Sequence, residues 1–502
     1  MNNNLYSHFL FSQHPGNTLF RLEDGSLLDY KTVDHKVAQY CQFFDFLGLK
    51  HGDRIAQQTE KCIDAMCVYL ASLRYGTIYI PLNPAFKEEE LSYFIEDSSP
   101  ALFVCEPSRT NEIKKLAQNN SSLFVESLDE YGDGSIQKNI QCFGHQFPIA
   151  YKDKKDIACI LYTSGTTGKP KGAMLSHGNL LSNGLALKEY WAFTEKDILL
   201  HMLPTFHCHG LFFSCHCVFL SGASMTFLPK LDINLAIKHL PNSTVLMGVP
   251  TYYTRLLADS RFTKELTSNM RLFVSGSAPL LEKTFHAFKE KTGKYILERY
   301  GMTETGINTS NPLNGNRVPG SVGFPLPAQT LRIVDDQDKE LNKNATGHIQ
   351  VKGDNVFLGY WQKTDKTKES FTNDGFFRTG DIGIKDNADY IYIIGRSKDM
   401  IITGGLNVYP KEIEGVIDKI PGVKESAVIG LPHSDFGEAV TAIVVPTLNT
   451  KLDDESVISI VKKTLANYKV PKKIIFSDAL PRNTMGKVQK NILRKNSSNL
   501  YD

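Results

Sequence analysis

From about Tyr30 to Gly430, the chain alternates short runs of β-branched or aromatic residues with longer segments of helical periodicity. The stretch from Cys62 to Tyr75 has the spacing of a helix, and Thr77 to Ile80 predicts the strand that follows it. Such alternation is typical of α/β proteins, whose helices cover a largely parallel sheet. We find no internal repeat, so the pattern predicts large α/β layers rather than a solenoid or a propeller.

The pattern changes near Gly395 to Asp399, where a predicted strand over Tyr390 to Ile394 runs into a glycine and charged residues. Beyond this point the sequence predicts a helix beginning at Pro410, strands at Val423 to Ile429 and Thr441 to Val445, a helix near Glu455 to Ala466, and a strand at Lys473 to Phe476. We therefore expect two domains, residues 1–397 and 398–502, the second being a small α+β domain.

Composition narrows the class of partner. The 502 residues are 41% hydrophobic, and 56 basic against 54 acidic residues leave a net charge of +2. That balance gives no field that would attract nucleic acid or an anionic membrane, so we expect small-molecule partners and no membrane insertion. The nine cysteines, from Cys41 to Cys217, lack the spacing of a disulfide framework, and Met1 to Pro15 lacks a targeting pattern. We expect a cytoplasmic protein.

The strongest local signal is a predicted buried strand, Asp156 to Tyr162, that leads directly into a loop rich in glycine, hydroxyl groups and lysine. Such a loop can turn tightly and offer N–H groups, hydroxyl donors and positive charge to a polyphosphate. Its candidate binding residues are Thr163, Ser164, Gly165, Thr166, Thr167, Gly168, Lys169 and Lys171. It is not a Walker A loop, because two residues separate its glycines and Pro170 follows Lys169. A flexible linker is the alternative, which the strand before the loop disfavours.

Residues Tyr162 to Gly172 resemble the phosphate loop of the adenylate-forming superfamily, which includes acyl-CoA synthetases, peptide-synthetase adenylation domains and luciferases. Segments similar to its later motifs follow in the family's order, at Tyr300–Thr305, Phe377–Asp381, Gly395–Asp399 and Pro481–Lys487. The resemblance implies a large N-terminal adenylate-forming domain of α/β layers and a small mobile C-terminal α+β domain. It also implies an ATP-dependent acid–thiol ligase that uses Mg²⁺ and coenzyme A and forms an acyl-AMP intermediate. Phe376 departs from the family, which more often has Trp or Tyr there.

The residues of these motifs suit that chemistry. Attack of a carboxylate on the α-phosphate of ATP brings two anions together, so their charge must be neutralised. The resemblance assigns Mg²⁺ to Glu304, the α-phosphate to Thr303, and the ribose to Asp381, with Arg396 on ribose or phosphate. The other cofactor-binding positions that we assign are Gly276, Glu298, Arg299 and Tyr300. Alone, each charged residue would be interpreted as an ordinary surface charge.

The small domain has two implied uses. Lys487, in a glycine-containing turn, corresponds to the lysine that promotes adenylation, while Gly404 and Gly405 correspond to the glycines that the small domain directs toward the pantetheine thiol of coenzyme A. Lys398 falls at the hinge position. A long ammonium side chain can bridge carboxylate and phosphate oxygens, and only glycines let the backbone approach a narrow channel closely. The alternative for Lys487 is a solvated loop lysine.

The acid is suggested by Arg255, which follows an apolar run, and by Ser277. A fatty-acid tunnel should be apolar throughout, whereas a guanidinium suits a second carboxylate. The segments 201–323, 403–414 and 480–490 resemble malonyl-CoA synthetases, and the family comparison places His207 and Met302 in the acyl pocket. We therefore expect malonate as the acid, with methylmalonate as a second substrate. Arg255 could instead be a helix-surface residue, and the His and Cys residues at positions 207 to 217 lie too close in sequence for the usual zinc spacing.

Four other functions remain open at this point. The chain could activate medium-chain, long-chain or aryl acids, or it could load a separate carrier protein. It could also bind adenylates as a regulator without catalysis, or catalyse a luciferase-like oxygenation, which no feature of the sequence demands. The oligomeric state is left open.

Overall fold

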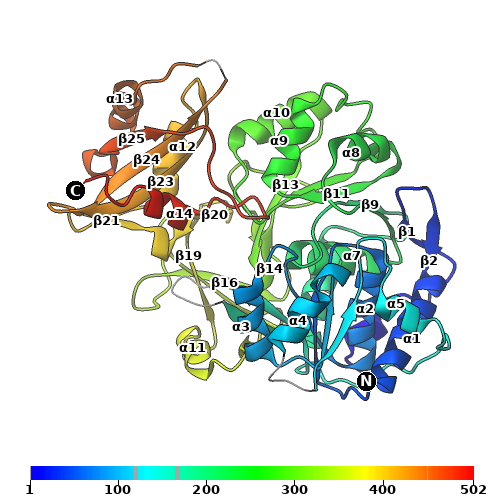
Figure 1. The fold of residues 1–502 in the computed structure, drawn as a ribbon. Coiled ribbons are helices and arrows are strands. Elements are labelled where there is room, and N and C mark those ends of the chain that lie inside the picture. Colours follow the sequence, from blue (N-terminus) through cyan, green and yellow to red (C-terminus); the bar gives the residue numbers. More distant parts are fainter. Residues whose placement is uncertain (1, 118–121, 164–169, 449, 502) are drawn as a thin grey trace. The chain divides into compact units, whose positions relative to one another are not determined.

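The computed structural model describes residues 2–117, 122–163, 170–448 and 450–501, which form two compact units (Figure 1). The first unit comprises Met1–Gly276, Leu280–Thr330 and Val351–Gly375, and the second comprises Ser277–Pro279, Leu331–Gln350 and Phe376–Asp502. The expected domain boundary at 397/398 lies inside the second unit, and it stays a prediction.

The first unit contains a seven-stranded and a nine-stranded sheet. The order of the first is β18-β8-β7-β4-β3-β5-β6, with bounds β3 (Arg54–Gln58), β4 (Ile78–Pro81), β5 (Leu102–Cys105), β6 (Phe124–Ser127), β7 (Ile157–Thr163), β8 (Lys171–Ser176) and β18 (Gly359–Tyr360). The order of the second is β15-β14-β13-β12-β11-β9-β10-β1-β2, with bounds β1 (Thr18–Arg21), β2 (Leu27–Asp29), β9 (Ile198–His201), β10 (Ser224–Phe227), β11 (Val245–Gly248), β12 (Leu272–Ser275), β13 (Ile296–Met302), β14 (Gly306–Ser310) and β15 (Phe324–Pro325).

The helices of the first unit pack on both sheets. Their bounds are α1 (Tyr30–Phe46), α2 (Ile63–Tyr75), α3 (Glu88–Ser98), α4 (Thr110–Leu116), α5 (Ser135–Ile140), α6 (His177–Tyr190), the π-helix η3 (His209–Ser214), α7 (Cys215–Ser221), α8 (Ile233–His239), α9 (Pro250–Ala258), α10 (Glu282–Thr292) and α11 (Thr364–Glu369). Helix α6 contacts both β8 and β14, so it connects the two sheets. Helix α2 is buried from Asp64 to Tyr75 and ends at Gly76, whose φ of 89° stops the helix.

The second unit contains a four-stranded sheet and a five-stranded sheet. The first has the order β16-β17-β19-β20, with bounds β16 (Gln329–Val334), β17 (Thr346–Gly353), β19 (Phe377–Lys385) and β20 (Ile391–Arg396). The second has the order β22-β21-β24-β23, with β25 paired to β24, and bounds β21 (Ile401–Thr403), β22 (Leu406–Val408), β23 (Val423–His433), β24 (Gly437–Pro446) and β25 (Lys473–Phe476).

Alternation along β23 and β24 gives the five-stranded sheet two apolar faces. Val428, Val440 and Val444 pack with α12 (Pro410–Ile417) and α13 (Asp454–Thr464). Ile429 and Ile443 on the opposite face pack with α14 (Lys490–Asn496). Both faces are therefore covered, as Figure 1 shows for the orange and red part of the chain.

The mixed α/β fold, with a large N-terminal and a smaller C-terminal part, confirms the expected fold class. The predicted helices at Cys62–Tyr75 and Pro410 and the strands at Asp156–Tyr162 and Lys473–Phe476 are all present, with ends shifted by at most a few residues. Within the described ranges, no helix combines the length and the apolar character that crossing a bilayer requires.

Candidate active site

The phosphate loop joins two paired strands of the first unit. Strands β7 and β8 run antiparallel and bring Thr163 opposite Lys171, so the loop leaves and rejoins the sheet at neighbouring positions. The Thr163 hydroxyl donates to the Lys171 carbonyl at 3.4 Å. Ser164, Gly165, Thr166, Thr167, Gly168 and Lys169 lie outside the described residues.

Glu304 lies in the tight connection between β13 and β14 and is 6% exposed. Its carboxylate accepts a hydrogen bond from the Tyr360 hydroxyl at 3.0 Å, and the Tyr360 ring centroid lies 4.2 Å from the Lys171 ammonium. Tyr360 therefore links the end of the phosphate loop to the carboxylate proposed for Mg²⁺. No local pattern marked Tyr360 in the sequence, because it comes from β18, nearly two hundred residues after the loop.

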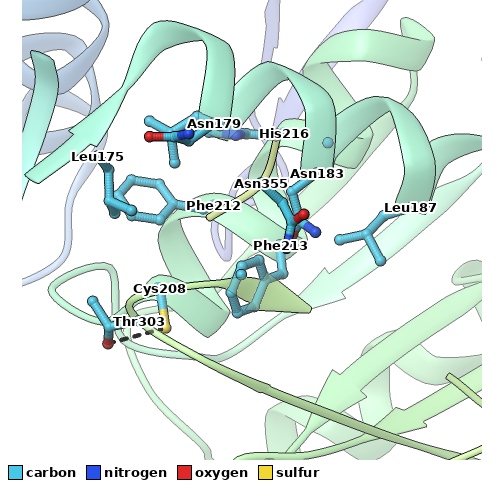
Figure 2. A pocket seen from close by; sticks show the side chains of 13 residues that line it. Leu175, Asn179, Asn183, Leu187, Cys208, Phe212, Phe213, His216, Thr303 and Asn355 are labelled. Atoms are coloured by element: carbon cyan, nitrogen blue, oxygen red, sulfur yellow. Dashed lines mark hydrogen bonds between the residues drawn. The ribbon is translucent and has the colours of Figure 1, made fainter. Parts of the chain in front are cut away.

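Thr303 and the expected acyl-pocket residue His207 both approach Cys208. The Cys208 sulfur lies 3.9 Å from the Thr303 hydroxyl and 3.7 Å from His207 Nδ1. Figure 2 shows Cys208 and Thr303 facing each other at the edge of a small cavity that Phe212, Phe213 and other side chains also line. Burial, and then the charge of Arg299, lowers the pKa of His207 to about 4, so its imidazole is neutral at physiological pH.

The other cofactor-binding candidates, and Met302 of the expected acyl pocket, lie directly after β12 or within β13. Glu298 is buried, and its carboxylate accepts the backbone N–H of Leu280 at 3.0 Å. Gly276 lies directly over Arg299, because a β-carbon added at Gly276 would lie 2.4 Å from the Arg299 guanidinium carbon. Tyr300 and Met302 are half-buried.

Arg255 and Ser277 are the two candidates for binding the acid. Arg255 lies in the last turn of α9 and is exposed. Ser277 has a φ of 69°, a left-handed conformation that is unusual for serine. The carboxylate-binding role of both residues stays a prediction.

The second unit brings four other candidates together. Asp381 on β19 and Arg396 on β20 are cross-strand partners, with Arg396 Nε 2.8 Å from Asp381 Oδ1, and Asp381 is 2% exposed. Desolvation, and then the charge of Arg396, lowers the pKa of Lys487 to about 8, although this side chain as a whole is exposed. Desolvation also lowers the pKa of Lys398, whose side chain as a whole is likewise exposed.

Local backbone structure explains how Lys487 is held. The Asn483 side chain accepts the N–H groups of Met485 at 3.0 Å and Lys487 at 2.9 Å. Gly486 completes the turn with a φ of 73°. The Asn483-to-Lys487 turn therefore fixes the backbone and leaves the lysine side chain free to reach outward.

Gly404 and Gly405 form a two-residue hairpin turn between β21 and β22, where Thr403 pairs with Leu406. Their φ angles are 56° and 77°. Two consecutive positive φ angles are the signature of a type I′ turn, in which other residues are strained. A β-carbon at either position would meet no atom within 4 Å, so the turn presents open backbone.

Two family models match the chain. The model described as AMP-binding enzyme covers residues 11–361, and the model for the C-terminal domain of AMP-binding enzymes covers residues 412–487. Malonate–CoA ligase of Arabidopsis thaliana is 35% identical over 92% of this chain and 81% of its own length. The mitochondrial malonate–CoA ligase ACSF3 of Mus musculus is 36% identical over 89% of this chain and 83% of its own length.

A more distant relative is the long-chain-fatty-acid–CoA ligase of Salmonella typhimurium, which is 30% identical over 95% of this chain and 91% of its own length. Among solved structures, ATP-bound MatB from Rhodopseudomonas palustris is 48% identical, covers both chains completely and superimposes with a TM-score of 0.97.

Proposed function

The chain belongs to the family of AMP-binding enzymes and is an acyl-CoA synthetase, and from this premise we propose that it joins malonate to coenzyme A. ATP with Mg²⁺ drives the reaction through a malonyl-AMP intermediate, and AMP and pyrophosphate are released. Methylmalonate is the proposed second acid.

The proposal rests mainly on the similarity of this chain to malonate–CoA ligases. Two such relatives from a plant and a mammal are 35% and 36% identical over about nine tenths of the chain, whereas the long-chain ligase is 30% identical. The polar and charged candidates His207, Arg255 and Ser277 also support a short dicarboxylic acid over a fatty acid, whose tunnel should be apolar. The sequence identities and the polar candidate residues together favour malonate over the long-chain and aryl acids.

In the first half-reaction, the first unit would hold MgATP. Glu304 suits the ion because Mg²⁺ takes hard oxygen ligands and is commonly held by one carboxylate together with substrate phosphates. The hydrogen bond from Tyr360 orients this carboxylate. Thr163 and Lys171 would contact the phosphates at the two ends of the loop, and Thr303 the α-phosphate.

The second unit would supply the remaining groups. Asp381 accepts the ribose hydroxyls while Arg396 holds the other side of its carboxylate. Lys487 bridges the attacking malonate carboxylate and the α-phosphate during adenylation, which neutralises the repulsion between two anions. In the second half-reaction, a rotation at Lys398 turns the Gly404-Gly405 hairpin toward pantetheine, and the coenzyme A thiolate displaces AMP.

We place the enzyme in the cytoplasm and in fatty acid metabolism, because malonyl thioesters donate two-carbon units to growing acyl chains. The mitochondrial relative of Mus musculus makes the compartment a point to be tested. Imaging of the full-length chain with a C-terminal fluorescent tag would test it, and a mitochondrial signal would contradict the proposal.

The experiment that tests the function is AMP release by the purified protein with ATP, Mg²⁺ and coenzyme A. Malonate, methylmalonate, acetate, succinate, benzoate and octanoate are compared at equal concentration. We expect the highest kcat/KM for malonate, followed by methylmalonate. A preference for octanoate or benzoate would retain the ligase activity and reject the dicarboxylic acid.

A further inference from the structure

Lys61 is a buried lysine that the proposed mechanism does not use. It follows β3 of the seven-stranded sheet, is 7% exposed, and reaches the ends of β9 and β10 in the nine-stranded sheet. Its ammonium lies 2.6 Å from His201 Nδ1 and donates to the carbonyls of His201 at 3.0 Å and Leu228 at 2.6 Å. Within the described ranges, no carboxylate influences the pKa of Lys61. Burying a lysine without a carboxylate is costly, so these three acceptors must hold it.

The hydrogen bonds of His201 have a fixed direction. Burial lowers the pKa of His201 well below its usual value, so the imidazole is neutral and carries one N–H. Its Nε2 lies 2.9 Å from the Gly210 carbonyl oxygen, which can only accept. Nε2 therefore carries the proton, and Nδ1 accepts from Lys61. A chain of hydrogen bonds thus runs from Lys61 through His201 to Gly210.

The Gly210 carbonyl lies in the first turn of the π-helix η3, where side chains supply part of the hydrogen bonding. The Cys215 thiol also donates to this carbonyl at 3.2 Å, and the Ser214 hydroxyl donates to the His209 carbonyl at 2.8 Å. Short π-helical turns are rare and are frequently found at functional sites. A β-carbon added at Gly210 would lie 2.1 Å from the Pro204 carbonyl oxygen, so the turn is closely packed on that side.

The same turn holds His207 of the expected acyl pocket. His207 Nδ1 accepts the backbone N–H of His209 at 3.2 Å, and the His207 carbonyl accepts the backbone N–H of Leu211 at 2.9 Å. Both donors are direct neighbours of Gly210 in the chain. A displacement of Gly210 therefore moves the backbone groups that orient the His207 ring.

We propose that Lys61, acting through His201 and Gly210, positions His207 against the acid in the acyl pocket. Lys61 acts through other residues, so it is a positioning residue rather than a catalytic one. The identity of the acid as malonate rests on the proposed function. Loss of Lys61 should weaken the binding of the acid and leave the binding of ATP unchanged.

The charge of Lys61 determines how many of these contacts it makes. The ammonium has three N–H groups for three acceptors, whereas the neutral amine has two. Burial lowers the pKa of Lys61 to about 7, so one contact is lost as the pH rises above neutrality. The groups that face Lys61 do not titrate there: the pKa of His201 is well below its usual value, that of Cys215 is raised to about 12, and the Phe227 ring, 4.2 Å from the ammonium, is not titratable.

The test compares KM for malonate and KM for ATP in wild-type protein, Lys61→Met and His201→Phe at pH 6.5. Phenylalanine keeps a ring that can stack on Phe227, whose centroid lies 5.4 Å from that of His201, but lacks both nitrogens. We expect KM for malonate to rise about 10-fold in both variants, because a buried chain of hydrogen bonds is broken. An unchanged KM for ATP would also show that the variants are folded. Lys152→Met is the matched control, because Lys152 is another lysine of the first unit that is 7% exposed.

Two further readouts distinguish positioning from a general loss of structure. The malonate KM of Lys61→Met divided by that of wild-type protein should decrease from pH 6.5 to pH 8.5, because wild-type protein itself loses the ammonium. Titration of malonate and of Lys487 affects both proteins alike and cancels in this ratio. In a His207→Ala background, Lys61→Met should cause no further rise in KM for malonate, since both substitutions remove the same interaction.

The outcomes separate the two claims. If wild-type protein has no activity with malonate, the proposed function fails, and the same variants are measured with the acid that wild-type protein prefers. The positioning role of Lys61 is overturned if Lys61→Met raises KM for the acid and for ATP alike, if the KM ratio does not change with pH, or if the full effect persists in the His207→Ala protein. If Lys61→Met does not fold, His201→Phe is used for the same measurements.

Discussion

Two lysines show how position decides what an ammonium group can do. Lys487 is on an exposed turn near Asp381 and Arg396, whereas Lys61 is 7% exposed in the core of the first unit. The Lys61 ammonium lies 2.6 Å from His201 Nδ1 and donates to the carbonyls of His201 at 3.0 Å and Leu228 at 2.6 Å. Its three N–H groups thus meet three acceptors, and His201 Nε2 lies 2.9 Å from the Gly210 carbonyl in the π-helix.

Replacing Lys487 should separate the two half-reactions. In Lys487→Ala, we expect adenylate formation to slow by about 100-fold or more, since a charge that stabilises the transition state is removed. Thioester formation from supplied malonyl-AMP should be nearly unchanged. Pyrophosphate exchange and single-turnover thioester assays measure the two steps, with Lys490→Ala as a neighbouring control. Equal loss in both assays would refute the assignment.

Replacing Lys61 should change how stability depends on pH. Burial lowers the Lys61 pKa in the folded protein to about 7, below the unfolded value of about 10.4, so the unfolded chain binds more protons between these values. This lysine therefore makes unfolding free energy rise with pH in that window, by up to about 1.4 kcal/mol per pH unit. His201 does not titrate there, because its pKa is lowered well below the usual value, and burial raises that of Cys215 to about 12.

Urea unfolding of wild-type protein and Lys61→Met at pH 7.5 and 9 measures this dependence. Both tryptophans, Trp191 and Trp361, belong to the first unit, so their fluorescence reports on the unit that contains Lys61. We expect the stability advantage of wild-type protein to grow at the higher pH. The exposed Lys114→Met is the control, and parallel pH dependence of all three proteins would show that Lys61 does not titrate in this window.

At the scale of elements, pairing between strands decides where strands and turns lie. The Gly404-Gly405 pair forms a hairpin turn between β21 and β22 that was not expected from the sequence. Strand β23 runs to His433, beyond the predicted end at Ile429, and includes Pro432. It continues because its partner β24 pairs with it as far as Gly437, and tertiary pairing outweighs the local breaking signals of Gly430 and Pro432.

Gly405→Ala should affect the second half-reaction more than the first. The left-handed conformation would cost a non-glycine residue about 1 to 2 kcal/mol, so the hairpin turn would shift although no atom blocks the new β-carbon. We expect slower thioester formation and normal adenylation. Gly395→Ala is the matched control, because it has equal space around it without a positive φ. Normal thioester formation in Gly405→Ala would argue against contact with pantetheine.

At the scale of the whole molecule, the chain leaves and re-enters its units several times. The boundaries between the two units fall within β16, within β17 and just before β19. Both apolar clusters of the five-stranded sheet lie within residues 401–501. The four-stranded sheet instead draws its strands from separate parts of the chain.

We expect the fragment 398–502 to fold on its own, since it contains the five-stranded sheet and its three helices. The fragment 376–502 adds β19 and β20 without β17, and leaves the Thr379 hydroxyl without its acceptor, the Ile349 carbonyl at 2.8 Å. An unpaired edge of this kind favours association. Circular dichroism melts and size-exclusion chromatography compare the two, and an unfolded 398–502 would show that the smaller fragment is not an independent unit.

The sequence alone determined features that are local or ordered along the chain. The strand before the phosphate loop, the helix at Pro410 and the succession of motifs require only neighbouring residues, because backbone geometry and periodicity act over short distances. From these, the α/β architecture and the adenylate-forming class could be predicted.

Only the tertiary structure decided which groups meet. Nothing local in the sequence distinguishes Arg299, which is 3% exposed, from an arginine on the surface. Tyr360 reaches Glu304, and Lys61 reaches His201, only because the fold brings together segments that are distant in sequence and belong to the two different sheets of the first unit. The charge that a side chain carries, and the ligand that it needs, depend on burial and on those distant partners, which the pattern of residues along the chain does not specify.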